Sequence, residues 1–413
     1  MKEKIFNWLD ESTDIVINLE TGLTMYPAVS PESGGEGELD KCLFLENWLR
    51  SHKITQIERY DAPDKRAKGE VRPNLVATIE GNNNDNRLWV LSHMDVVPPG
   101  EEKLWQSNPW TCVKTDSPQG IKLTGRGVED NQQGIVSSIL ASLAFVKLGI
   151  KPERTIKLLF ASDEEVGSVY GIEWLVKNHS GLFKKSDMVL VPDGGDIKGE
   201  YIEIAEKNIM WMRFATSGKQ AHASMPDLGA NAFIAGSDLA VRLYNELSSK
   251  FSERDPLFDP DYSTFQPTKK EANVPNINTI PGEDVFYMDM RVLPRYCPDV
   301  ILAEVDKIKT EIEKKYRVTV NYTLPQKMVS KPTDVNAPIV RLLTKAAGAV
   351  YNIKTRPVGI GGGTMAASLR NIGIDCAVWT KTDETLHQPN EYALVNNIIG
   401  DAKVIALLAI NCE

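Results

Sequence analysis

Long apolar runs and paired cysteines are missing from this sequence. No stretch reaches the roughly 20 apolar residues that a membrane-spanning helix needs, and the first residues, MKEKIFNWLDESTD, hold no apolar signal core. The cysteines are odd in number, scattered and without a CxxC pair, which argues against a disulfide framework and a thiolate metal site. They are Cys42, Cys112, Cys297, Cys376 and Cys412. We therefore expect a cytoplasmic protein with reduced cysteines.

Positive charge is also scarce. The net charge is −9 and the pI is near 5.3, and the most basic run, DKRAKGEVR at 64–72, is short and mixed. This balance argues against nucleic acid or an anionic membrane as the main partner. With 413 residues, 42% of them hydrophobic and 25% charged, the chain has room for two or three globular domains.

Strands and helices alternate over the first half of the chain, which predicts an α/β layer structure. The run LWVLSHMD at 88–95 is almost continuously apolar, as expected for a strand covered on both faces. Further strands are expected at 54–60, 74–80, 155–162 and 188–193, and helices at 3–20, 38–52, 131–148 and 168–178.

The pattern changes near residue 208 and returns to α/β after about 330. Between these points we expect the order β-α-β-β-α-β of a ferredoxin-like domain, with NINTI as its second strand and a long Pro-rich loop at 252–275. The predicted fold is therefore an α/β domain with a mixed sheet, interrupted by an inserted α+β domain. The expected parts are 1–207, 208–328 and 329–413.

Five segments that end apolar strands, or open the loops after them, carry possible metal ligands or catalytic carboxylates. They are SHMD (His93, Asp95), GRGVEDNQQG (Asp130), SDEEVGS (Glu164, Glu165), LVPDGG (Asp193) and ETLHQPNE (His387). Each segment alone is weak evidence, but their recurrence at successive strand ends indicates a site, because functional groups of open α/β sheets gather there. Two imidazoles with several carboxylates and no thiolate suit Zn²⁺, Co²⁺ or Mn²⁺.

These segments, together with GKQAHASMP, NTIPG and GIGGGT and in the order in which they occur, resemble the motifs of the twentieth metallopeptidase family. That family contains acetylornithine deacetylase, succinyl-diaminopimelate desuccinylase, aminoacylase, glutamate carboxypeptidase and the carnosinase-type dipeptidases. The resemblance covers about residues 20–405 and is nearest to desuccinylase-like metallohydrolases of archaea and bacteria. It implies a two-zinc catalytic domain and an inserted lid that also forms a homodimer.

The resemblance implies a role for each residue of the metal site. The metal ligands are His93 and Asp193 on one ion, Glu165 and His387 on the other, and Asp130 between them. Asp95 would orient the imidazole of His93, and Glu164 would be the general base that activates a metal-bridging water. The resemblance also implies a cis peptide between Asp130 and Asn131.

The resemblance assigns further residues to the substrate. His222 matches a lid histidine that stabilises the oxyanion and comes from the partner subunit. Asn278 and Arg291 match carboxylate-binding residues, and an Arg fork suits a carboxylate. Gly363 and Thr364, in GIGGGT before an expected helix at 364–371, match a loop that holds the substrate's carboxylate end.

Two features depart from the family's usual pattern. Asp193 stands where deacylases and carboxypeptidases commonly have Glu and where aminopeptidases and dipeptidases commonly have Asp. The loop reads DNQQG where Asp-Met-Lys-Gly is frequent. The leading hypothesis is a two-metal amidohydrolase of an N-acyl amino acid, and the alternative is a dipeptidase or aminopeptidase on the same site. A catalytically inactive binding module is disfavoured because all the ligand positions and Glu164 are kept.

Overall fold

The computed structural model describes residues 1–410, so Cys412 lies outside the described residues. It divides into two compact units. The first unit comprises Met1–Ile204, Thr333–Val358 and Thr364–Glu413, and the second comprises Ala205–Pro332 and Gly359–Gly363. The insert expected at 208–328 falls inside the second unit; its roles as a lid and a dimerisation surface stay predictions.

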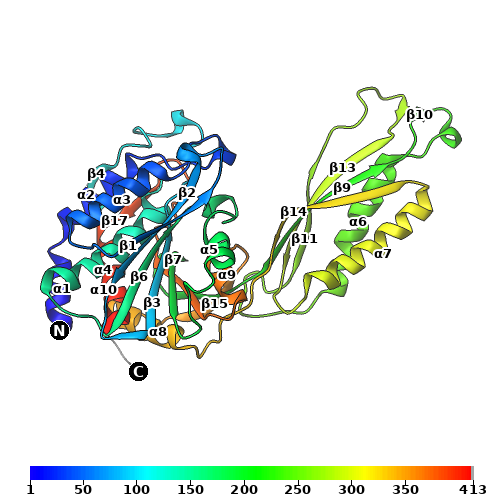
Figure 1. The fold of residues 1–413 in the computed structure, drawn as a ribbon. Helices are drawn as coiled ribbons and strands as arrows, with labels where there is room; N and C mark the ends of the chain where they lie inside the picture. The colour runs from blue at the N-terminus through cyan, green and yellow to red at the C-terminus, as the bar shows by residue number, and fades with distance from the viewer. Residues whose placement is uncertain (411–413) are drawn as a thin grey trace. The chain divides into compact units, whose positions relative to one another are not determined.

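An eight-stranded mixed sheet forms the centre of the first unit, in the order β1-β2-β6-β3-β7-β16-β8-β15 (Figure 1). Its middle four strands run parallel to one another. They are β6 (Arg154–Ala161), β3 (Asn83–His93), β7 (Met188–Asp196) and β16 (Cys376–Lys381). The flanking strands are β1 (Ile57–Pro63), β2 (Val71–Ile79), β8 (Tyr201–Glu206) and β15 (Arg356–Ile360).

Helices cover both faces of this sheet. In β3, Trp89 and Leu91 belong to the core cluster that includes α5 (Ile172–Asn178) and α9 (Ala366–Asn371). The alternate residues Leu88 and Val90 are buried as well, on the face against which α4 (Gly134–Leu148) packs. The other helices of this unit are α1 (Lys2–Asp10), α2 (Thr13–Thr24), α3 (Leu39–Ser51), α8 (Pro338–Tyr351) and α10 (Val395–Ile410). The apolar run of β3 is thus explained by burial on two faces.

Several local predictions for the first unit were wrong. The single helix expected at 3–20 is two helices, because the chain breaks at Glu11 and Ser12, where the Ser12 hydroxyl donates to the carbonyl of Trp8 at 2.7 Å. Four strands were not expected. They are β8 and the small sheet β17-β5-β4, made of β4 (Val113–Ser117), β5 (Gly120–Thr124) and β17 (Tyr392–Leu394).

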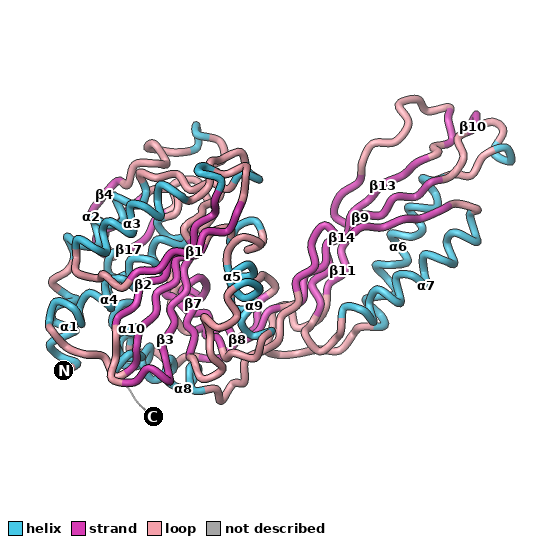
Figure 2. Tube along the Cα trace, in the orientation of Figure 1, coloured by secondary structure: helices cyan, strands magenta, loops and turns pink. Residues whose placement is uncertain are grey.

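The second unit is a four-stranded antiparallel sheet, ordered β11-β13-β9-β14, with two helices on one face (Figure 2). Its elements are β9 (Asn208–Ser217), α6 (Ala232–Lys250), β11 (Thr264–Lys270), β13 (Glu283–Val292), α7 (Pro298–Tyr316) and β14 (Thr319–Met328). The order β-α-β-β-α-β is confirmed. The buried face of α7 carries Ile301, Val305, Ile308 and Ile312.

The second strand of this order is β11 and not NINTI. That motif contributes only β12 (Thr279–Ile280), which pairs with β10 (Ala221–His222). Strand β11 lies within the expected loop 252–275 and carries Pro267, which an edge strand tolerates. Phe265 is its one buried side chain, so the segment lacks the apolar alternation that marks a strand.

None of the helices in the described part of the chain combines the length and apolarity that crossing a membrane requires.

Candidate metal centre

The possible ligands of the first unit meet at one edge of its sheet. His93 is the last residue of β3, Glu164 and Glu165 follow β6, Asp193 lies in the second half of β7, and His387 lies in the loop after β16. These four strands are parallel neighbours, so their carboxyl ends share an edge, as the sequence predicts. Asp130 reaches the same place from the segment that precedes α4.

Asp130 lies between the two histidines. Its Oδ1 is 3.0 Å from Nε2 of His93, and its Oδ2 is 3.0 Å from Nε2 of His387. Nε2 of His93 is also 3.4 Å from Oδ1 of Asp193, and Nε2 of His387 is 3.1 Å from Oε2 of Glu165. The arrangement is two adjacent clusters that share one carboxylate.

These distances fit two metal ions. Ligand atoms about 2.0–2.2 Å from one tetrahedral ion lie roughly 3.3–3.6 Å apart, close to the 3.0–3.4 Å observed. Nδ1 of His93 lies 3.0 Å from the main-chain oxygen of Asp95, which can only accept. Nδ1 therefore carries a hydrogen, and Nε2 can face two carboxylates without repulsion only if it is protonated or a cation lies between them. The donor set thus requires a positive charge at this point.

The pKa values in the cluster show the same imbalance. Burial acts to lower the pKa of His93, but the carboxylates of Asp193 and Asp130 raise it well above its ordinary value. Hydrogen bonds to Asp130 and Glu165 raise the pKa of His387 to about 10. Burial, with the charge of Asp130, raises the pKa of Glu165 to about 7. The site holds more negative charge than its surroundings stabilise, and divalent cations correct such an excess.

Asp95 and Asn131 hold these ligands in place. The carboxylate of Asp95 accepts from the main-chain N–H groups of Glu164 and Glu165, both at 3.0 Å, and its Oδ1 lies 3.4 Å from Nδ1 of His93. It thereby joins the turn after β6 to the end of β3. The amide of Asn131 donates to Oδ1 of Asp193 at 2.9 Å. The cis peptide predicted between Asp130 and Asn131 is confirmed.

Glu164 completes the centre without taking part in the pairing described above. Its carboxylate lies in one cluster with the side chains of His93 and Asp193. Burial, followed by the charge of Asp193, raises its pKa well above the ordinary value. A carboxylate with a raised pKa, close to the metal ligands, can accept a proton from a water and return it to a leaving group.

Two residues that the sequence analysis missed join the ligand loops. Glu129 precedes Asp130 and accepts from N–H groups of the loop that carries His387. Glu391 follows His387 and accepts from N–H groups beside Asp130. Both lie inside quoted motifs, GRGVED and LHQPNE, but nothing in either motif alone indicates that one faces the other.

The second unit holds most of the predicted substrate residues, in two separate places. His222 in β10 pairs with Thr279, next to Asn278, at the end of the ladder beyond Glu283 and Ser217. Arg291 pairs with Ile209 at the other end and donates to the carbonyl of Gly361 at 2.8 Å. The strand from Glu283 to Arg291 alone spans roughly 26 Å at about 3.3 Å per residue.

The GIGGGT loop is divided between the two units. Gly363 belongs to the second unit, where a Cβ would collide with the side chain of Met328. Thr364 belongs to the first, and its hydroxyl accepts from the N–H of Ala366, where α9 begins. The expected helix at 364–371 is only six residues long, so it offers no substantial helix terminus to an anion.

Comparisons with known proteins place this chain among metallohydrolases, in agreement with the candidate metal centre. The sequence profile described as peptidase family M20/M25/M40 matches residues 89–411. An uncharacterized metallohydrolase of Methanococcus maripaludis is 38% identical over 411 residues, 95% of this chain and 97% of the relative. A succinyl-diaminopimelate desuccinylase of Wolbachia sp. subsp. Brugia malayi is 27% identical over 76% of each chain. The crystal structure of aminopeptidase PepT from Bacillus cereus matches with a TM-score of 0.75 at 18% identity, covering 96% of this chain and 98% of its own. At that identity the structural likeness shows the fold alone.

Proposed function

The chain belongs to peptidase family M20/M25/M40 and is a metallohydrolase of amide or peptide bonds. We propose that it cleaves the amide bond of a small N-acyl amino acid. One observation carries the two-metal part of the proposal, and the likeness to a succinyl-diaminopimelate desuccinylase supports the N-acyl substrate. Asp130 directs one carboxylate oxygen to each of two histidines, at 3.0 Å in both cases. This is the ligand arrangement expected of two divalent ions that share a carboxylate.

Two Zn²⁺ ions, or Co²⁺ or Mn²⁺, fit the donor set. His93 and Asp193 would hold one ion, Glu165 and His387 the other, and Asp130 both. Bound ions would polarise the scissile carbonyl and lower the pKa of an attacking water. Asp95 would fix the imidazole of His93 and the turn that bears Glu165.

Glu164 is proposed to move the proton. It takes a proton from the attacking water and delivers it to the leaving nitrogen, which needs a group that is ionised before attack and protonated afterwards. Its raised pKa supports the second half of this cycle, and neighbouring cations would support the first.

Arg291 and the GIGGG loop are proposed to bind the substrate carboxylate. The guanidinium of Arg291 is held against Asp289, with Nε 2.7 Å from Oδ1, and against the carbonyl of Gly361. These contacts fix the plane of the fork beside a loop whose Gly361 has open space around it. Gly363, in the same unit, is proposed to line this site.

The separation of the proposed substrate residues supports a homodimer. Strand β13 from Glu283 to Arg291 spans about 26 Å, and His222 and Asn278 lie beyond its Glu283 end, in the separate β10-β12 pair, so one small substrate cannot touch both places within one copy. We assign His222, the proposed oxyanion donor, and Asn278 to the site of a partner subunit.

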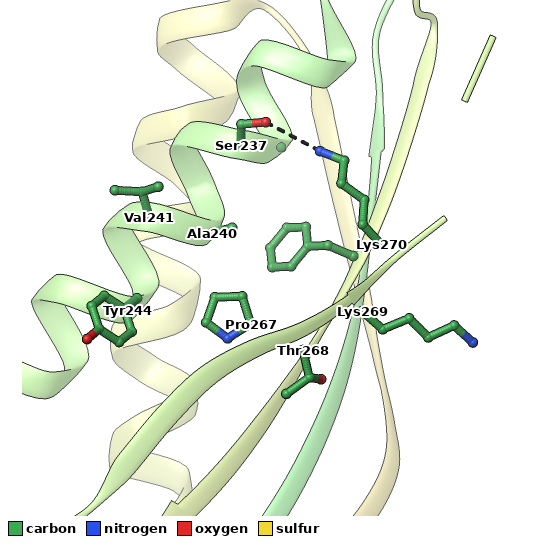
Figure 3. Close-up of a pocket in the computed structure, with 10 residues that line it drawn as sticks. Ser237, Ala240, Val241, Tyr244, Pro267, Thr268, Lys269 and Lys270 are labelled. Atoms are coloured by element: carbon green, nitrogen blue, oxygen red, sulfur yellow. Dashed lines mark hydrogen bonds between the residues drawn. The ribbon is translucent and has the colours of Figure 1, made fainter. Parts of the chain in front are cut away.

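The surface proposed to join the two copies lies on α6 and β11. Exposed side chains of Val241 and Tyr244, with Pro267 and Thr268 opposite, line a groove of about 510 Å³ (Figure 3). Strand β11 is an edge of its sheet. Apolar side chains beside a free sheet edge are a surface that a second copy can cover.

A dipeptidase or aminopeptidase on the same site is the second candidate. Asp193 supports it because, in the family that the sequence resembles, Asp is common at this position in enzymes with such substrates. The cytoplasmic location stays a prediction from the sequence.

The test is a turnover screen of the zinc- and cobalt-loaded protein. N-succinyl-diaminopimelate and N-acetylornithine are compared with unblocked dipeptides, and a Glu164→Ala protein serves as the inactive control. Turnover of a blocked amino acid supports the proposal. Turnover of dipeptides alone would support the second candidate instead. Full activity in the Glu164→Ala protein would overturn the role of Glu164 in catalysis.

A further inference from the structure

We infer that Glu129 and Glu391 form a reciprocal clasp that positions the two ligand loops and sets the affinity of the second metal site. The inference rests on the proposed metal centre. Neither glutamate is one of the proposed metal ligands. Each neighbours one ligand in sequence and binds the loop that carries the other, so each is a positioning residue.

Glu391 holds the loop that carries Asp130. Its Oε1 accepts from the N–H groups of Glu129 at 2.9 Å and Asp130 at 3.0 Å. Its Oε2 accepts from the N–H of Gly127 at 3.0 Å and from Nη1 of Arg126 at 2.6 Å. The side chain is fully buried. Hydrogen bonds to an ionised carboxylate are stronger than those between neutral groups. Glu391 therefore holds the main chain of Asp130 in position.

Glu129 holds the loop that carries His387. Its Oε2 accepts from the N–H and the hydroxyl of Thr385, both at 2.6 Å, and its Oε1 accepts from the N–H of Asp383. The hydroxyl of Thr385 accepts in turn from the N–H of Tyr392 at 2.9 Å. Glu129 is 6% exposed, so these bonds are shielded from water.

The second metal site depends on this clasp more than the first. His93 and Asp193 are placed by β3 and β7, whereas His387 lies in a loop, is about half exposed and has a φ of 60°. Without Glu129, the loop that carries His387 would lose three hydrogen bonds. Metal binding would then have to supply more of the ordering of His387, which costs conformational entropy. Residues that orient metal ligands typically change metal affinity by about 10–100-fold when replaced.

Calorimetric titration of the metal-free protein with Zn²⁺ tests the inference, with the visible spectrum of bound Co²⁺ as a second readout. We expect Glu129→Ala to retain one tight site and to weaken the other by about 10–100-fold. Glu129→Asp keeps the charge but withdraws the carboxylate by one methylene, so it should show most of the same loss. Glu391→Gln should weaken both sites, because Asp130 serves both.

Asp187→Asn is the matched control. Asp187 is also a buried carboxylate that accepts several hydrogen bonds, from Arg87, Trp89 and the N–H of Lys184. It immediately precedes β7, at the end of that strand opposite Asp193. Its replacement should lower thermal stability and leave both metal affinities unchanged.

Several results would overturn the inference. The first is an unchanged metal affinity in Glu129→Ala. The second is full affinity in Glu129→Asp together with a loss in Glu129→Ala, because the charge alone would then explain the effect. The third is a loss in Asp187→Asn as large as that in Glu129→Ala. Circular dichroism of each metal-free variant verifies that it is folded. The proposed function fails separately: if wild-type protein binds two metals but hydrolyses no substrate, the clasp stands, and if it binds fewer than two, both fall.

Discussion

Replacing Arg72 with Met should destabilise the first unit strongly, because it would leave buried carboxylates without a counter-charge. The guanidinium has no exposed surface, and Glu38, its main partner, has none either. Nε of Arg72 is 2.7 Å from Glu38, Nη2 donates to Ser30 at 2.9 Å, and Nη1 is 3.1 Å from Asp163. Removing one member of a buried ion pair costs about 3–5 kcal/mol, and we expect a loss of this size.

Arg66 supplies the control within the same network. It pairs with Asp64 at 2.8 Å and Glu32 at 2.5 Å, two carboxylates that Arg72 also approaches, but half of its side chain is exposed. Arg66→Met should therefore cost less than Arg72→Met, because water screens the exposed guanidinium of Arg66 and the buried Asp64 keeps Arg72 at 3.7 Å. The contrast isolates burial from the number of ion pairs.

Urea unfolding of the metal-free proteins, followed by circular dichroism, measures these losses. A double variant, Arg72→Met with Glu38→Gln, should lose less than the sum of its single variants, because the buried charge is removed with its partner. The reasoning is refuted if Arg66→Met costs as much as Arg72→Met, or if Arg72→Met lies within about 1 kcal/mol of wild type, the range of a surface pair.

Three further predictions concern catalysis, assembly and pH. Glu164→Ala should bind both metals by calorimetry yet lose turnover by about 10²–10⁴-fold, and full activity would contradict its role as the base. Mixing inactive His222→Ala with inactive Glu164→Ala should restore part of the activity through mixed dimers, whereas no recovery after verified subunit exchange would contradict a shared site. Burial raises the pKa of Asp401 to about 6, despite hydrogen bonds from Thr380, Tyr351 and Gln133. A folded pKa above the unfolded one means that stability falls as pH rises through the window from about 4 to 6, by up to about 3 kcal/mol. Other buried carboxylates, such as Glu165, act in the same direction, so urea titrations should show a smaller fall in Asp401→Asn than in wild type.

The clustering of the proposed metal ligands could be predicted from the sequence because each signal is local. His93 ends an apolar strand, and Glu164 and Glu165 directly follow another. A buried strand that ends in charged groups is conspicuous in a single sequence, and parallel strands bring such ends to one edge without further information. The distances between these side chains are then set by the spacing of the strands, and the apolar runs that form those strands can also be recognised in the sequence.

The clasp and the second strand of the insert could not be predicted, for two different reasons. Glu129 and Glu391 are joined across 262 residues, and a glutamate that accepts N–H groups has the same local sequence as one exposed to water. Strand β11 fails for lack of a pattern, since an edge strand with one buried side chain shows no alternation. Its identity is set by pairing with β13, which is a tertiary property.

The two departures from the usual family pattern are in contact with each other, and this changes what Asp193 indicates. Asn131, in the unusual DNQQG loop, donates to Oδ1 of Asp193 at 2.9 Å and to the carbonyl of Pro192 at 2.7 Å. A Met at 131 could offer no such donor, and a Glu at 193 would place its carboxylate one methylene further along. The short carboxylate and the amide that reaches it therefore form one structural unit. Asp193 satisfies a local hydrogen-bond requirement whichever substrate is bound, so on its own it is weaker evidence for a dipeptidase than the sequence comparison suggests.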